Sequence, residues 1–142
     1  MFLNVVSHSF INTIVIKGGG DKTVVNWKLD LARKGEHKIF EPYKKAIIDL
    51  LLEADKALGS GAVWKAVNEG GIKISRASVV FFLNFMVDDG LCTFEDATGK
   101  GGHHRLYRIF DDWEGVKNHI IIRMIEGLGI ALDHDMSWAL ER

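Results

Sequence analysis

The sequence predicts an α+β protein in which a helical and β-hairpin core carries additions at both ends. Three observations predict it: β-branched and aromatic runs in the first forty residues, apolar residues at helical spacing after Pro42, and two short β-like runs around Gly-Lys-Gly-Gly at 99–102. A chain of 142 residues can bury one real core. Its 47% hydrophobic and 26% charged residues are typical of a globular protein.

The N-terminal region is predicted to be a β-hairpin followed by a linker. NTIVIK (12–17) and TVVNWKLDL (23–31) have strand composition, and GGGD lies between them, where glycine permits the positive φ of a tight turn. A phosphate-binding loop would need the spacing GxxxxGK[ST] between a strand and a helix, and KGGGDKT lacks it. Residues 32–41 are interpreted as the linker.

Three helices are predicted to follow. Pro42 suits the first turn of a helix because its missing N–H needs no partner there. The expected buried stripe of this helix is Tyr43, Ala46, Ile47, Leu50 and Leu51. A short second helix over 60–71 should direct Val63, Trp64 and Val67 inward. Ser75 is expected to cap a third helix that ends at Gly90.

Two strands, 91–96 and 104–110, are predicted next, and then helices over 111–132 and 134–141. Three helices followed by a two-stranded wing form a winged helix-turn-helix. We therefore expect an N-terminal hairpin extension and linker at 1–39, a winged-helix DNA-binding domain at 40–110 and a C-terminal helical dimerisation segment at 111–142.

ISRASVVFFLNFMVDDGLC (74–92) resembles the recognition-helix segment of small prokaryotic winged-helix regulators, such as the penicillinase-repressor and MarR-like groups. The shared pattern is a Ser/Thr-rich helix start, an apolar stripe, and acid-Gly-Leu leading into the wing. DATGKGGHHRLYRIF (96–110) corresponds to the wing, with its Gly- and Lys-containing tip and aromatic strand. The resemblance covers about residues 40–128 and implies a DNA-binding transcriptional regulator of the repressor type; the N-terminal hairpin lies outside it.

The start of the third helix supplies the candidate base contacts. In a helix-turn-helix, the N-terminal residues of the recognition helix meet base edges in the major groove of double-stranded DNA. The candidates are Ser75, Arg76, Ala77 and Ser78. Arg76 could bind a guanine through two hydrogen bonds, and the hydroxyls could reach bases or phosphates. Alternatively, Ser75 only caps the helix and Arg76 is a solvated cation.

The wing supplies the candidate backbone contacts. Alternation along a strand places His104 and Arg108 on one face and Arg105 and Tyr107 on the other. Lys100 and Arg105 are the preferred contacts with phosphate or the minor groove, and His103 at the tip is a further candidate. The alternative is a solvated hairpin without a ligand.

Phe81 and Phe85 oppose the DNA-binding interpretation. A helical wheel with Val79 in the core puts Phe82, Leu83 and Met86 on the same side as Val79. It puts the rings of Phe81 and Phe85 on the outer face, as an exposed apolar patch. Asp88 and Asp89 would repel phosphate nearby. The competing hypothesis is a winged-helix protein-interaction module that does not read DNA sequence, with the two rings buried in a protein partner or under the N-terminal hairpin.

The long C-terminal helix is unusually apolar, which indicates a homodimer contact, since readers of two half-sites are commonly two-fold dimers. The alternative is that it closes its own domain's core. The predicted dimer-interface residues are Val116, Ile120, Ile121, Met124, Ile125 and Leu128.

Charge is distributed unevenly along the chain. Residues 1–45 carry eight Lys/Arg against four Asp/Glu, residues 46–142 carry ten against fifteen, and residues 111–142 carry three against seven. A basic N-terminal part and an acidic C-terminal part suit a protein that presents one face to an anion, although chance scatter of surface charge explains the distribution equally well.

Other classes of function lack support in the sequence. The apolar runs are too short or interrupted to span a bilayer, the first residues lack a leader pattern, and the single cysteine, Cys92, fits a reducing compartment, so we expect a cytoplasmic protein. Neighbouring His103 and His104 point to opposite faces of a strand and should not chelate one metal ion. No catalytic motif occurs, and neither an enzyme nor a cofactor is predicted.

Overall fold

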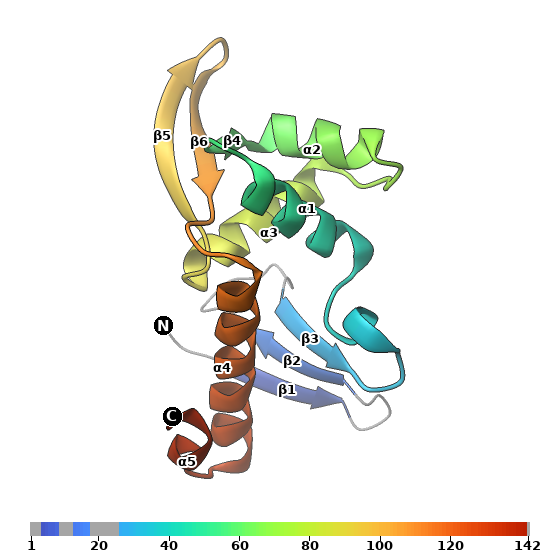
Figure 1. Ribbon diagram of the computed structural model, residues 1–142, viewed down its shortest axis with the longest axis vertical. Coiled ribbons are helices and arrows are strands. Elements are labelled where there is room, and N and C mark those ends of the chain that lie inside the picture. The colour runs from blue at the N-terminus through green and yellow to red at the C-terminus, as the bar shows by residue number, and fades with distance from the viewer. Residues whose placement is uncertain (1–3, 9–12, 18–25, 142) are drawn as a thin grey trace. The chain divides into compact units, whose positions relative to one another are not determined.

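The computed structural model describes residues 4–8, 13–17 and 26–141, and the chain divides into two compact units (Figure 1). One unit is Glu41–Trp113, and the other combines Met1–Phe40 with Glu114–Arg142. Helices and antiparallel sheets occur together, so the predicted α+β class is confirmed.

The unit Glu41–Trp113 contains three helices and a three-stranded antiparallel sheet of strand order β4-β6-β5 (Figure 1). In chain order its elements are α1 (Pro42–Glu53), β4 (Leu58–Gly59), α2 (Ser60–Glu69), α3 (Arg76–Asp88), β5 (Thr93–Gly99) and β6 (Gly102–Arg108). This order is compatible with a winged helix. The strand β4 was not predicted, because two residues carry no periodic signal; only its pairing with Leu106 and Tyr107 identifies it.

Local sequence signals place α1 and α3 where they were expected. Pro42 occupies the first turn of α1, and the Ser75 Oγ accepts a hydrogen bond from the Ser78 N–H at the start of α3. Of the stripe predicted for α1, Ile47 and Leu51 are buried. Tyr43, Ala46 and Leu50 are only half-buried, whereas Lys44 and Ile48 are buried, so the buried stripe is rotated around the helix from the predicted one. The predicted core face of α3 is confirmed by the burial of Val79, Phe82, Leu83 and Met86.

The inward orientation predicted for Trp64 is wrong. Val63 and Val67 are buried on α2, but Trp64 remains 38% exposed. Its indole N–H donates to the Ile74 carbonyl oxygen at 2.8 Å. The ring therefore lies against the turn that joins α2 to α3, where its polar edge finds an acceptor.

The outward orientation predicted for Phe85 is also wrong. Phe85 is only 7% exposed, and its ring stacks on the fully buried Phe82 with centroids 6.2 Å apart. Phe81, in contrast, is 44% exposed, as the helical wheel predicts. The outer face of α3 therefore presents one phenylalanine ring, where the sequence predicted a patch of two.

The other unit contains a three-stranded antiparallel sheet of order β1-β2-β3, with β1 at Asn4–His8, β2 at Thr13–Lys17 and β3 at Asn26–Asp30. The predicted hairpin corresponds to β2 and β3, but β1 pairs with β2 as well, so a simple hairpin extension is not the observed structure. The expected Gly-Gly-Gly-Asp turn lies outside the described residues. Trp27 is fully buried and meets Phe40 edge to face.

The predicted linker contains a short 3-10 helix, η1 (Gly35–Lys38). The C-terminal helices of this unit are α4 (Trp113–Leu132), whose first residue belongs to the other unit, and α5 (Ser137–Leu140). The last turn of α4 ends with Asp133 in the left-handed region, at φ +48°, and the His134 N–H donates to the Gly129 carbonyl oxygen at 2.9 Å. That bond satisfies a carbonyl at the helix end.

A buried thiol and a half-buried phenol of the unit Glu41–Trp113 stay protonated at neutral pH. Burial raises the pKa of the Cys92 thiol from 9.0 to about 11. Burial, assisted by the negative charge of Glu41, raises the pKa of Tyr43 from 10.0 to about 12. Cys92 therefore behaves as a core residue and not as a reactive thiolate.

These shifts predict a loss of stability in alkaline solution. Unfolding returns both groups to their ordinary pKa values, so between about pH 9 and 12 the unfolded chain releases protons that the folded chain retains. The stabilising contribution is complete below pH 9 and is lost as the pH rises through 11. Urea unfolding at pH 7, 9 and 10.5 measures it. A free energy of unfolding that does not change across this range would contradict the assignment, and Cys92→Ala should flatten the decline.

Candidate nucleic-acid interface

The start of α3 is fixed by hydrogen bonds from its own side chains and from α2. The hydroxyls of Ser75 and Ser78 lie 2.9 Å apart, so both residues contribute to the cap. Ala77 and Arg76 are exposed. A Cβ atom placed on Gly61 would lie 3.3 Å from the Arg76 Nη2, so the guanidinium lies against the first turn of α2.

The turn between α2 and α3 is held by a residue that the sequence reasoning missed. The Asn68 side chain donates to the carbonyl oxygens of Trp64 and Ile74, at 2.9 and 3.2 Å, and accepts from the Ile74 N–H at 3.3 Å. Together with the Trp64 indole bond, these contacts satisfy the backbone of the turn and fix where α3 begins.

The outward stripe of α3 comprises Ala77, Phe81, Asn84 and Asp88, spaced by three or four residues. Ala77, Phe81 and Asp88 are exposed, and Asn84 is half-buried. Asp89, the second acid expected to repel phosphate, is buried, so only Asp88 presents a carboxylate at this end of the stripe.

The hairpin of β5 and β6, here called the wing, has the predicted glycine-rich tip. Gly99 pairs with Gly102, and Lys100 and Gly101 form the turn between them. Gly101 and Gly102 have φ values of +105° and +95°, which only glycine adopts without strain. Lys100 and His103 are exposed at the tip.

One hydrogen-bonded network connects the wing to α3. The Asn84 Oδ1 accepts from the Tyr107 hydroxyl at 2.7 Å and from the Arg105 Nη1 at 3.2 Å. The Arg105 guanidinium also lies 4.0 Å from the centroid of the exposed Phe94 ring. Arg105 is therefore exposed but held in one place, with a cation-π contact on its flat face and a hydrogen bond at its edge.

Arg105 and Tyr107 can both reach Asn84 because they lie on the same face of β6. Tyr107 is buried, and burial raises its pKa although the Arg105 charge acts in the opposite direction. Alternation puts Arg105 and Tyr107 on the same face of β6, as the sequence predicts. On the other face, Arg108 lies 4.9 Å from the centroid of the Phe110 ring.

The six residues predicted for a dimer contact differ in exposure. Val116 and Ile120 are buried in the single chain, and Ile121 is 48% exposed. Met124, Ile125 and Leu128 are half-buried. Further exposed apolar side chains follow toward the C-terminus, at Ile130, Leu132, Trp138 and Leu140.

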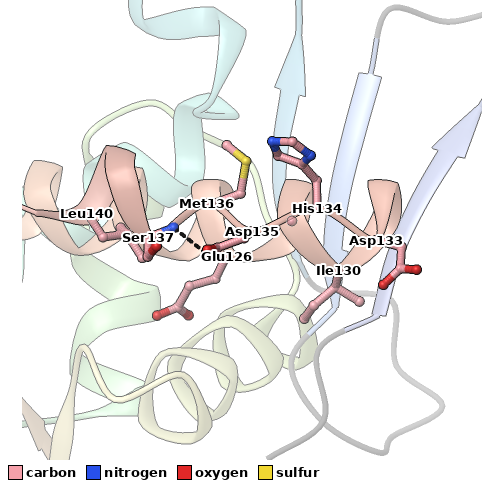
Figure 2. A pocket seen from close by; sticks show the side chains of 9 residues that line it. Glu126, Ile130, Asp133, His134, Asp135, Met136, Ser137 and Leu140 are labelled. Carbon is pink, nitrogen blue, oxygen red and sulfur yellow. Dashed lines mark hydrogen bonds between the residues drawn. The ribbon is translucent and has the colours of Figure 1, made fainter.

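An open pocket of about 670 Å³ lies between α4 and α5. Figure 2 shows that His134 extends from the turn in a different direction from Asp133 and Glu126, so the polar groups do not converge on one point. The Asp135 carboxylate accepts a hydrogen bond from the Ser137 N–H, which lowers the pKa of that carboxyl. Within the part of the chain that the structure describes, no three His, Cys, Asp or Glu side chains are grouped as metal ligands would be.

Comparisons with other proteins give one structural likeness. The chain is similar to a solved structure described as a possible transcriptional regulator from Methanosarcina mazei Go1, with 15% sequence identity and a TM-score of 0.48. The likeness covers 66% of this chain and 78% of that one. No protein-family model and no curated protein matches the sequence. Across the described residues, no helix is both long and apolar enough to cross a membrane.

Proposed function

We propose that this chain is a winged-helix transcriptional regulator that binds double-stranded DNA. The observation that carries the proposal is the Asn84 link, which fixes a cationic wing beside the outward stripe of α3. The start of α3 and the wing can then approach one duplex together. As in the penicillinase-repressor and MarR-like groups that the sequence resembles, we propose repressor-type action in the cytoplasm.

In this proposal α3 enters the major groove. Arg76 contacts a base edge, and Ala77 permits close approach. Ser75 serves mainly as the cap, since its Oγ is engaged by Ser78. Lys100, His103 and Arg105 contact the phosphate backbone, and the contacts held by Arg105 reduce the side-chain entropy lost on binding.

We further propose that the protein is a homodimer, formed through the C-terminal segment. A partner subunit would meet Ile121, Met124, Ile125 and Leu128, because Val116 and Ile120 are already buried in the single chain. Sedimentation equilibrium of the full chain tests this proposal: a monomer at micromolar concentration would refute it.

A second candidate function is a winged-helix protein-interaction module. The exposure of Phe81 favours it, but the burial of Phe85 reduces the apolar surface that α3 could offer to a protein. The two functions differ in their response to salt, because DNA binding releases counterions.

Titration of the full chain with a mixed-sequence duplex at 50 and 200 mM salt tests the proposed function. We expect binding at the lower concentration and a marked loss of affinity at the higher one, since each neutralised phosphate contributes about −0.9 to the slope of log K against log salt concentration. Fluorescence anisotropy of a labelled duplex measures it. Absence of binding at 50 mM salt would exclude the regulator and leave the interaction module.

A further inference from the structure

Phe81 is the only large apolar side chain of α3 that is exposed. It lies in the middle of the outward stripe, one turn after Ala77 and one turn before Asn84. Its position is thus between the start of the helix, where Arg76 lies, and the network that holds the wing.

Along the outward stripe, the neighbours of Phe81 are small or polar. Ala77 adds little apolar surface beside it, and the Phe85 ring is buried against Phe82. A protein-binding surface usually presents a contiguous apolar patch of several hundred Å². A single ring on an otherwise polar stripe fits a ligand that offers one small apolar group among polar ones.

The charges around the ring favour an anionic ligand. From Ser75 to Val87 the chain has no acidic residue, and the N-terminal end of α3 carries the positive end of the helix dipole. Arg76 lies at one end of the stripe, and Arg105 contacts Asn84 toward the other. Asp88 is the one acid exposed on the stripe, two turns beyond Phe81.

We propose that Phe81 is a specificity-determining residue that contacts the 5-methyl group of a thymine in the major groove. The inference rests on the proposed function, because it requires α3 to lie in that groove. The thymine methyl is the apolar group that an A·T pair presents there, among hydrogen-bond donors and acceptors. An exposed phenylalanine on the groove-facing stripe supplies the matching apolar contact.

The test removes only the methyl group from the DNA. A duplex selected by the full-length protein from a random pool is resynthesised with each thymine replaced in turn by deoxyuridine, which keeps base pairing but lacks the methyl. We expect one thymine of a half-site at which this replacement weakens wild-type binding about fourfold, the loss expected for one unburied methyl group. Phe81→Ala should weaken binding to the thymine duplex and show no further loss with deoxyuridine.

Two variants control for indirect effects. Phe81→Leu keeps an apolar side chain and should retain part of the sensitivity to the methyl group. Phe110→Ala removes a ring that is 74% exposed two residues after the end of β6, and the sensitivity of this variant to the methyl group should equal that of the wild type.

The outcomes separate this inference from the function on which it rests. Failure to select or bind any duplex at low salt overturns the proposed function and this role of Phe81 with it. Tight binding with no deoxyuridine effect, an equal effect in wild type and Phe81→Ala, or a selected site without an A·T pair overturns the role of Phe81 alone.

Discussion

Replacing Phe82 with alanine is expected to lower the free energy of unfolding by about 3–5 kcal/mol. The ring is fully buried, meets Tyr43 edge to face at a centroid distance of 6.0 Å, and stacks on Phe85 at 6.2 Å. Truncation removes both ring contacts and leaves a cavity beneath α3. Since small domains have total stabilities of about 5–15 kcal/mol, this loss should shift the denaturation midpoint strongly.

Phe81→Ala is the matched control, because the same atoms are removed from the neighbouring position of the same helix. Phe81 is 44% exposed, so we expect a change within about 0.5 kcal/mol. Urea denaturation followed by circular dichroism measures both variants. Similar losses at the two positions would mean that the face of α3 turned to the core is misassigned.

The helices were predictable because their signals are local. Pro42 fixes the start of α1, the Ser75 hydroxyl caps α3, and apolar residues at spacings of three and four define the buried face. These features need no knowledge of what packs against the helix. The placement of Arg105 and Tyr107 on one face of β6 follows from an equally local alternation and was predicted for the same reason.

The remaining features depend on residues distant in sequence. The two-residue strand β4 exists only through its pairing with β6, and β1 only through its pairing with β2. Phe85 lies at the boundary between the buried and the exposed face of α3, where the stacking of its ring on Phe82 decides between burial and exposure. Trp64 is held at the surface by a carbonyl ten residues away.

The candidate site shows the same division. Arg105 was predicted from the charge of the wing, but no role was predicted for Asn84, which lies 21 residues before Arg105 and accepts a hydrogen bond from it. A polar residue in the middle of the outward stripe of a helix was the available signal. Whether that polar residue bonds another element depends on where the wing lies, and the sequence of the helix alone does not give the position of the wing.

The wing cations should account for much of the affinity for DNA if the proposed function is correct. We expect the double variant Lys100→Ala/Arg105→Ala to bind every duplex at least about 100-fold more weakly at low salt, since each of the two lost hydrogen bonds to a charged group contributes about 1.5–3 kcal/mol. The slope of log K against log salt concentration should become shallower by about 1.8, because two phosphate contacts are lost. Anisotropy titrations at four salt concentrations give both quantities.

Three further variants distinguish residues that contact DNA from a residue that only positions the wing and from general surface charge. Arg76→Ala should weaken binding and also relax base preference, whereas equal losses on all sequences would reduce Arg76 to a phosphate contact.

Asn84→Ala removes no charge, so it should lower affinity by a smaller factor with a nearly unchanged salt slope, because the wing must then be ordered on binding. Lys117→Ala removes an exposed cation of α4 that is paired with Glu114. If it weakened binding as much as the wing variants, the wing would have no special role, and general surface charge would explain the affinity.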